Sequence, residues 1–162
     1  MTETKVLIVM GSRSDLPSME GCMAQLDEFG VGYEVRVLSA HRTPNAVLEL
    51  SENAKDRGIQ VIIAAAGGAA HLAGVIASST PLPVIGIPIQ TSALGGMDSL
   101  LSTVQMPSGV PVATVAIGKS GAKNAAILAC QMIGLQDADI QNKIIEFKKA
   151  QAEKILADSV VK

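Results

Sequence analysis

The chain has 162 residues, of which 48% are hydrophobic and 17% are charged, and its formal net charge is -2. This length fits one domain with a sizeable core, and the charge together with an aromatic content of 2% argues against a nucleic-acid partner. Since about a quarter of the residues in an ordinary globular protein are charged, a lone monomer of this composition would expose much apolar surface, which favours a homo-oligomer.

The N-terminal residues and the apolar segments give no sign of export or membrane insertion. Residues 1–10 lack the basic start and long apolar stretch of a signal peptide, so we expect a cytoplasmic protein. The most apolar segment, 61–77, is rich in Ala and Gly and contains His71, which disfavours a membrane span. Cys22 and Cys130 lie far apart in predicted helices and are expected to be buried thiols rather than a disulfide.

Short apolar, β-branched runs alternate along the chain with segments of helical periodicity. The runs cover residues 6–9, 35–38, 61–66, 84–87 and 112–117. Runs that are apolar on both faces suit a central parallel sheet covered by helices. We therefore predict a three-layer, doubly wound α/β fold with a five-stranded parallel sheet of the flavodoxin-like type. It forms a single domain over residues 1–162, with a core over about 4–135.

The helix boundaries can also be predicted. Ser14 or Asp15 can cap a first helix that runs to about residue 29. Pro44 is in its favoured first-turn position for a second helix, and Asp98 can cap a later, short one. The helix over about 121–133 consists largely of small residues and is a candidate subunit interface. Residues 138–160 are charged and amphipathic, which predicts an additional C-terminal helix that packs on a neighbouring subunit.

Polar motifs follow the first two predicted strands, where an open α/β sheet binds its ligands. Residues 11–15, Gly-Ser-Arg-Ser-Asp, offer a tight turn, hydroxyls and helix-terminal N–H groups, which suit a phosphate; Asp15 can bind sugar hydroxyls instead. This segment matches neither a Walker loop nor the dinucleotide fingerprint, so an ordinary capped turn is the alternative. Residues 39–44 bring His41, which can transfer a proton near neutral pH, next to Arg42, whose fork fits a phosphate. A loop histidine bonded to the backbone is the alternative there.

The third strand is followed by Gly-Gly-Ala-Ala-His-Leu at 67–72. Backbone amides without covering side chains can hold a carboxylate or carbon dioxide, although the glycines could equally serve close packing on the sheet. His71 is the second of only two histidines, and the chain has no Cys-x-x-Cys, so we expect no transition-metal cluster. There is no Gly-x-Ser-x-Gly motif of the standard serine hydrolases either. Of the reaction types considered, acid–base catalysis without a cofactor is the one that these residues still allow.

Five motifs in one register resemble the PurE family, and the resemblance covers about residues 4–135. They are Gly-Ser-Arg-Ser-Asp at 11–15, Ser-Ala-His-Arg-Thr-Pro at 39–44, Gly-Gly-Ala-Ala-His-Leu at 67–72, Asp-Ser-Leu-Leu-Ser-Thr-Val-Gln-Met-Pro-Ser-Gly-Val-Pro-Val at 98–112 and Ala-Ile-Gly-Lys-Ser-Gly-Ala at 116–122. The resemblance implies a step of de novo purine synthesis. In this step a carboxylate moves from the exocyclic nitrogen of an aminoimidazole ribonucleotide to ring carbon 4, without cofactor or metal, in an octameric enzyme.

The resemblance also implies residue roles. His41 would be the acid/base residue, and Ser12, Ser14, Asp15 and Arg42 would hold the ribose 5-phosphate. The remaining predicted substrate contacts are Ser39, Ala40, Gly67, Gly68, Ala69, Ala70, His71 and Leu72.

Two readings compete with this mutase interpretation. A second branch of the family adds carbon dioxide directly to aminoimidazole ribonucleotide, but it typically has Lys after the histidine, where this chain has Arg42. Ala73 departs from the Pro that relatives often carry and puts the role of His71 in doubt more than that of His41. A non-catalytic nucleotide-sensing module is the rival outside the enzymes.

Overall fold

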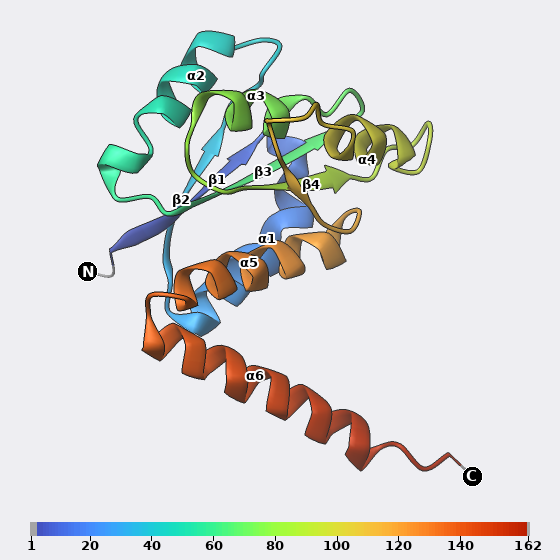
Figure 1. The fold of residues 1–162 in the computed structure, drawn as a ribbon. Helices are drawn as coiled ribbons and strands as arrows, with labels where there is room; N and C mark the ends of the chain where they lie inside the picture. Colours follow the sequence, from blue (N-terminus) through green and yellow to red (C-terminus); the bar gives the residue numbers. More distant parts are fainter. Residues whose placement is uncertain (1–2, 162) are drawn as a thin grey trace.

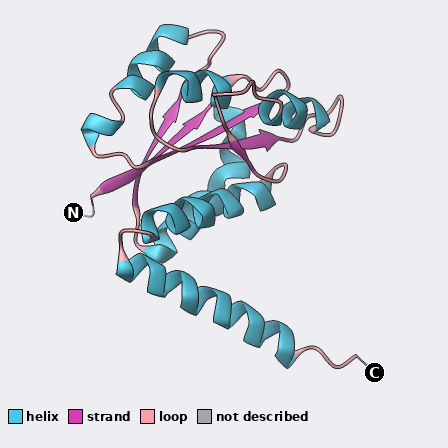
Figure 2. Ribbon diagram, in the orientation of Figure 1, coloured by secondary structure: helices cyan, strands magenta, loops and turns pink. Residues whose placement is uncertain are grey.

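The computed structural model describes residues 3–161 and contains a central parallel sheet with helices on both faces (Figures 1 and 2). The strand order is β2-β1-β3-β4-β5. The strands are β1 (Thr4–Met10), β2 (Gly32–Val37), β3 (Val61–Gly67), β4 (Val84–Ile89) and β5 (Ala113–Thr114). The predicted five-stranded, doubly wound α/β fold of the flavodoxin-like type is confirmed.

The central strands are apolar on both faces because each face of the sheet meets a layer of helices. In β1, Val6 and Ile8 belong to one buried cluster and Leu7 and Val9 to the other. This alternation between two cores explains why the run reads as continuously apolar. By contrast, β2 is an edge strand, and its side chains are half-buried or exposed.

The last strand is shorter than predicted. The run 112–117 forms ladder pairs with β4 only at Ala113 and Thr114. The chain continues beside β4, where Val115 N–H donates to the Gly86 carbonyl and Gly118 N–H to the Pro88 carbonyl. Because Pro88 has no N–H, it can donate no ladder bond of its own, and the regular pairing stops.

The helices form the two outer layers of the fold (Figure 1). On one face lie α2 (Pro44–Glu52), α3 (Leu72–Ser79) and α4 (Met97–Val104), and on the other lie α1 (Leu16–Phe29), α5 (Lys119–Gly134) and α6 (Ala138–Ala157). Two short 3-10 turns, η1 (Arg13–Asp15) and η2 (Lys55–Arg57), complete the chain.

The structure corrects which side chains cap two of the predicted helices. The N-cap residue of α1 is Asp15, as predicted, but its side chain makes no capping bond to this helix; the Ser12 side chain caps the preceding turn η1 instead. At α4 the N-cap is Gly96, and Asp98 lies in the first turn, where its carboxylate accepts a hydrogen bond from Thr91 Oγ1. The helix α2 begins at Pro44, as predicted.

The small residues of α5 pack inside the subunit. Ala122, Ala125, Ala126 and Ala129 are fully buried in the cluster that α5 forms with α1 and the sheet. These four residues allow close approach of α5 to its own core, and an interface through the remaining faces of α5 stays a prediction. Cys22 and Cys130 are buried free thiols, as expected.

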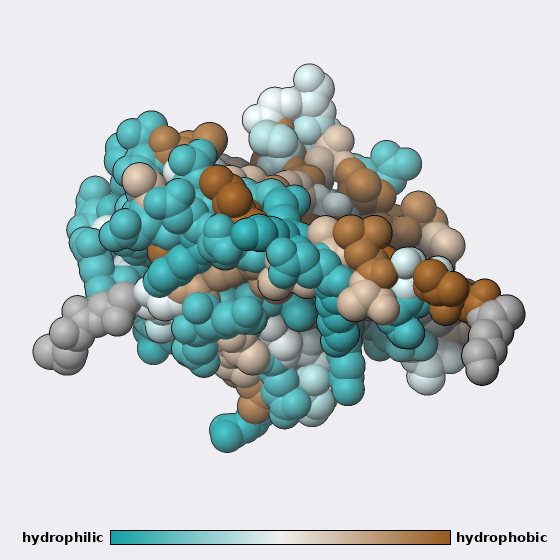
Figure 3. Space-filling model, turned by 90° about the horizontal axis from the view of Figure 1, so that it is seen from below, coloured by the Kyte–Doolittle hydropathy of each residue, from teal (hydrophilic) through white to brown (hydrophobic). Residues whose placement is uncertain are grey.

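The C-terminal helix α6 is anchored at one end only. Ile144 is buried, Phe147 packs edge-to-face on Phe29 with ring centroids 5.4 Å apart, and Lys143 Nζ donates to the Phe29 carbonyl at 2.7 Å. Farther along, α6 extends away from the rest of the chain (Figure 1), and Ile155 and Leu156 are 71% and 70% exposed. Figure 3 shows apolar surface near this end of the molecule. Packing of this half on a neighbouring subunit stays a prediction.

None of the helices within residues 3–161 combines the length and the apolarity that a membrane span requires.

Candidate functional site

A cleft of about 470 Å³ lies at the carboxyl ends of β1, β2 and β3, where the three polar loops meet. It collects all of the predicted site residues except Gly68 and Ala70. It also includes two residues that were not predicted, Gly11 and Ala66. The lining residues are Gly11, Ser12, Ser14, Asp15, Ser39, Ala40, His41, Arg42, Ala66, Gly67, Ala69, His71 and Leu72.

The loop after β1 is held by its own polar side chains. Ser12 N–H donates to Asp15 Oδ2 at 3.1 Å, while Ser14 N–H and Ser14 Oγ donate to Ser12 Oγ at 3.3 and 2.8 Å. These bonds form a capping box around the turn η1 and place two hydroxyls at the rim of the cleft. The arrangement suits an anion, because hydroxyls and helix-terminal N–H groups are donors.

Asp15 is the buried carboxylate of this loop, with only 7% of its surface exposed. Burial raises the pKa of Asp15 above its ordinary value, and the hydrogen bond from Ser12 N–H opposes this effect in part. The hydrogen bond from Ser12 N–H therefore compensates the charged form only in part. A ligand that donates hydrogen bonds, such as a sugar hydroxyl, would supply the rest.

The loop after β2 is closed by Thr43 and Ser39. Thr43 Oγ1 accepts from Ser39 N–H at 2.9 Å and donates to the Ser39 carbonyl at 3.0 Å. Arg42 Nε donates to Ser39 Oγ at 3.2 Å, and Arg42 Nη2 donates to the Gly11 carbonyl at 3.1 Å. The guanidinium thus bridges the loops after β1 and β2, and its remaining N–H groups are available to an anion.

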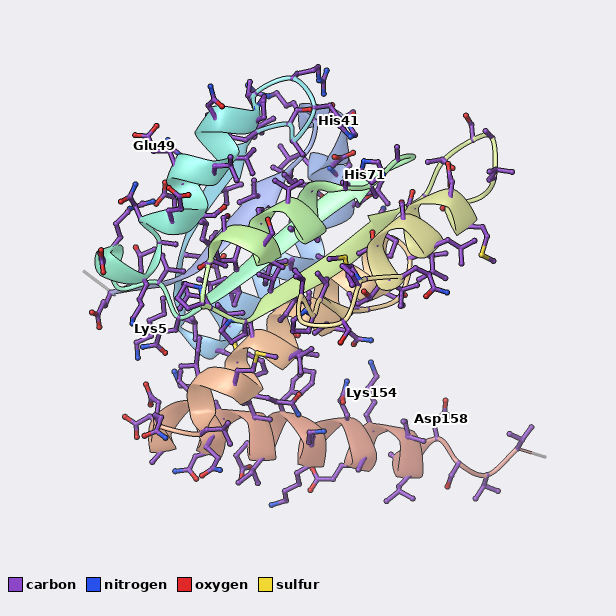
Figure 4. All side chains as sticks on the ribbon, turned by 45° about the horizontal axis from the view of Figure 1, so that its top comes forward. Lys5, His41, Glu49, His71, Lys154 and Asp158 are labelled. Carbon is purple, nitrogen blue, oxygen red and sulfur yellow. The ribbon has the colours of Figure 1, made fainter. Side chains whose placement is uncertain are left out.

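The two histidines of the chain meet at the other side of the cleft. His41 Nε2 lies 2.8 Å from His71 Nδ1, and the rings are in an edge-to-face arrangement with centroids 4.9 Å apart. Figure 4 shows both labelled imidazoles side by side above the ends of the strands. One ring nitrogen donates and the other accepts, so each histidine fixes the orientation of its neighbour.

The loop after β3 departs from the predicted arrangement of free backbone amides. Gly68 N–H donates to Ser99 Oγ at 2.9 Å, and Ala70 N–H donates to Ser102 Oγ at 2.9 Å. Both serines belong to α4, which packs against this loop, so these two amides are not free to bind a carboxylate. Among residues 68–70 of the described chain, only the Ala69 N–H has no partner.

The contacts that sequence reasoning missed come from residues far apart in the chain. Ser99 and Ser102 lie more than thirty positions beyond the loop they bind, and the only signal was the row of hydroxyl residues at 98–103. Gly11 was identified as a turn residue but not as a carbonyl that Arg42 would reach. Within residues 3–161, no group of three or more His, Cys, Asp or Glu side chains has an arrangement that could hold a metal ion.

The two ends of the cleft therefore differ in chemical character. Ser12, Ser14 and Arg42 present donors at one end, and His41 with His71 forms a titratable pair at the other. A substrate that carries a phosphate and a group needing protonation fits between them.

Comparison with known proteins agrees with this geometry. Residues 5–154 match the family model described as AIR carboxylase. The N5-carboxyaminoimidazole ribonucleotide mutase of Vibrio parahaemolyticus is 55% identical over 154 residues, which cover 95% of this chain and 96% of that protein. The protein of the same name from Thermotoga maritima is 55% identical over 152 residues, which cover 94% and 88%.

A solved structure gives the same result for the fold. The crystal structure of Treponema denticola PurE superposes with a TM-score of 0.86 at 30% sequence identity, covering 96% of each chain. The resemblance to the PurE family that five motifs predicted is confirmed, and the chain belongs to the AIR carboxylase family.

Proposed function

We propose that this protein is a mutase of de novo purine synthesis that converts 5-(carboxyamino)imidazole ribonucleotide to 4-carboxy-5-aminoimidazole ribonucleotide. The observation that carries this proposal is the His41–His71 pair, 2.8 Å apart, in the same cleft as Arg42 and the serine loop. Relatives that are named for this reaction and are 55% identical to nearly the whole chain support it.

In this proposal the substrate phosphate binds at the end of the cleft formed by Ser12, Ser14 and Arg42. The hydroxyls and the guanidinium supply the donors that a phosphate dianion needs. Asp15 accepts from a ribose hydroxyl, which offsets the unfavourable burial of its charge. This orientation brings the imidazole ring of the substrate towards His41.

His41 transfers the proton in both directions. The protonated imidazole first donates to the carbamate nitrogen, whose bond to carbon breaks with the electron pair going to nitrogen, and carbon dioxide is released. Ring carbon 4 then attacks the carbon dioxide, and its surplus proton returns to His41, which restores aromaticity. The reaction has no net proton change, so one group serves as acid and then as base.

His71 and the Ala69 amide assist these steps. His71 fixes the tautomer and orientation of His41 through the contact between their rings. The Ala69 N–H, which has no partner among residues 3–161, donates to the carbon dioxide that is held between the two steps. Retention of carbon dioxide next to carbon 4 gives the advantage of a near-attack geometry.

The alternative within the family is direct carboxylation of aminoimidazole ribonucleotide. The description of the family model names a carboxylase, whereas the similar curated proteins are named mutases. Arg42 after the histidine, in place of the Lys of that branch, also favours the mutase.

The test supplies each carboxylated isomer separately to the purified protein and follows its interconversion by absorbance, without added bicarbonate or nucleoside triphosphate. We expect rapid equilibration of the two isomers from either side. Turnover that requires aminoimidazole ribonucleotide and bicarbonate would instead identify the direct carboxylase. Tight binding of both isomers without turnover would identify a nucleotide-sensing module.

We also propose a homo-octamer that works in the cytoplasm. The octamer is what the resemblance to the PurE family implies, and the apolar surface left on a single chain supports self-association. The cytoplasmic location stays a prediction from the sequence.

A further inference from the structure

A row of hydroxyl side chains on α4 holds the loop that carries His71. Ser99, Ser102 and Thr103 lie one turn apart or less on the side of α4 that faces residues 67–70. None of the three lines the cleft, so they cannot contact a substrate bound there. Their hydrogen bonds nevertheless end on the backbone of the loop between β3 and His71.

Ser99 connects this loop to the end of the neighbouring strand. Its side chain is fully buried, and its Oγ donates to the Ile89 carbonyl at 2.6 Å while accepting from Gly68 N–H at 2.9 Å. Gly68 has a positive φ of 71°, which glycine adopts without steric cost, so the chain can bend here and present its N–H to Ser99. Ser99 thereby fixes the first bend of the loop relative to β4.

Ser102 holds the second bend, directly before the histidine. Its Oγ accepts from Ala70 N–H at 2.9 Å and lies within hydrogen-bond distance of the Gly68 carbonyl, at 3.1 Å, and of the Asp98 carbonyl, at 2.7 Å. Ala70 is the residue before His71, and its side chain is buried. A shift of the Ala70 backbone would therefore move the His71 ring away from His41.

We infer that Ser99 and Ser102 are positioning residues, which set the loop so that His71 reaches His41 and the Ala69 N–H faces the cleft. This inference rests on the proposed function, because it assigns the two serines a part in the proton-transfer step. A displacement of about 1 Å at a catalytic group can lower a rate by about a hundredfold, so loss of one such anchor should affect kcat. The hydrogen bonds that hold Ser12, Ser14 and Arg42 end on residues of the loops after β1 and β2 and not on α4, so the phosphate end should be unaffected.

The kinetic test compares Ser102→Ala with Ser102→Thr, which keeps the hydroxyl, and with Ser78→Ala. Ser78 is a matched control because its Oγ bonds only to the Val75 carbonyl on the exposed side of α3. We expect Ser102→Ala to lower kcat by at least about tenfold with KM within about twofold of wild type, since geometry at the proton-transfer end is lost. Ser102→Thr should recover most of kcat, and Ser78→Ala should equal wild type. Ser99→Ala serves as the second variant should Ser102→Ala not fold, as judged by circular dichroism.

A second readout is independent of turnover. With only two histidines in the chain, selective labelling of histidine gives a simple NMR spectrum, in which the His41 and His71 ring protons of the wild type should show a mutual nuclear Overhauser effect. We expect this effect to weaken in Ser102→Ala and to persist in Ser78→Ala. If the wild type proves inactive as a mutase, the proposed function fails while the NMR comparison still decides the positioning role. Folded Ser102→Ala and Ser99→Ala proteins with unchanged kcat and an unchanged Overhauser effect would overturn the inference.

Discussion

Arg42 shows how one side chain can serve structure and binding together. Two of its N–H groups are used within the protein, on Ser39 Oγ and on the Gly11 carbonyl, and these bonds fix the plane of the guanidinium across two loops. A lysine could not reproduce this, since an ammonium group has no fork. The preset orientation lowers the entropy that is lost when an anion binds.

For Arg42→Lys we expect KM for the ribonucleotide to rise by about tenfold or more, with a smaller change in kcat, because fork geometry contributes to binding in the ground state and transition state alike. Steady-state kinetics with either isomer measures the changes in KM and kcat separately. Arg57→Lys, in the turn η2 and outside the cleft, is the matched control. An unchanged KM in Arg42→Lys would mean that Arg42 only joins the two loops.

His41→Asn should abolish proton transfer and leave the binding cleft intact. General acid–base catalysis contributes about a hundredfold to ten-thousandfold, so we expect kcat to fall by about a thousandfold. Binding of the ribonucleotide, measured by calorimetry, should stay close to wild type because the phosphate contacts are made by other residues. Retention of turnover would remove His41 from the acid/base role.

Asp15→Asn tests the burial of a carboxylate next to the phosphate end. Because burial raises the pKa of Asp15, its favourable contribution to folding is present below the unfolded pKa, near 4, and is lost as pH rises through the folded value. Asn keeps the oxygen that accepts from Ser12 N–H but carries no charge. We therefore expect the stability of Asp15→Asn relative to wild type to increase from pH 4 to pH 7 in urea unfolding experiments. A difference independent of pH would contradict this.

At the scale of elements, the strands could be predicted from the sequence more accurately than the contacts that the helices make. The runs of β1, β3 and β4 are buried on both faces, so their apolar composition is a local signal that survives without the rest of the fold. The role of Asp98 depends on its hydrogen bond with Thr91. The length of the β5 ladder depends on Pro88 in the neighbouring strand. Both contacts form only in the folded chain. Most residues that line the cleft could be predicted because the parallel strands all end at one edge of the sheet. The bonds from α4 join residues more than thirty positions apart, so no local sequence pattern predicts them.

The N-terminus of α6 gives a prediction at the same scale. Asp137 accepts from Lys5 Nζ at 2.9 Å and from Ile140 N–H at 3.3 Å, and these bonds, led by that from Lys5, lower the pKa of Asp137. A lowered pKa stabilises the fold above the unfolded value and ceases to do so as pH falls through the folded one. We expect Asp137→Ala to lower Tm at pH 7, with a difference that shrinks below about pH 4.

Thermal unfolding followed by circular dichroism measures this effect, and Asp158→Ala at the opposite end of α6 is the control (Figure 4). An equal loss of Tm at pH 3 and pH 7 would show that the charge of Asp137 contributes nothing.

At the scale of the whole molecule, the apolar excess of the composition is only partly absorbed by the fold. Large aliphatic side chains remain exposed on α4 and towards the C-terminus, on elements that do not line the cleft. The exposed members are Leu94, just before α4, with Met97, Leu101 and Val104 on it, and Leu135, Ile145, Ile155, Leu156, Val160 and Val161 towards the C-terminus. Such surface is unusual on a stable monomer and common at subunit interfaces.

The double substitution Ile155→Lys with Leu156→Lys should reduce the assembly to smaller species. Burial of a large aliphatic side chain contributes about 1.5–3 kcal/mol, and the loss is repeated in every copy of a homo-oligomer. Light scattering coupled to size-exclusion chromatography measures the mass, and Lys148→Ala and Lys149→Ala on the same helix are controls. A mass equal to wild type would place the interface elsewhere.

The walls of the cleft are drawn entirely from residues 11–72, so the reacting groups occupy less than the first half of the chain. In the proposed function, the later part of the chain contributes through α4, which bonds to the loop before His71, and through the exposed end of α6, which we propose as an interface between copies. Substitutions of exposed residues after residue 72 should therefore alter how the copies associate and leave the residues that line the cleft unchanged.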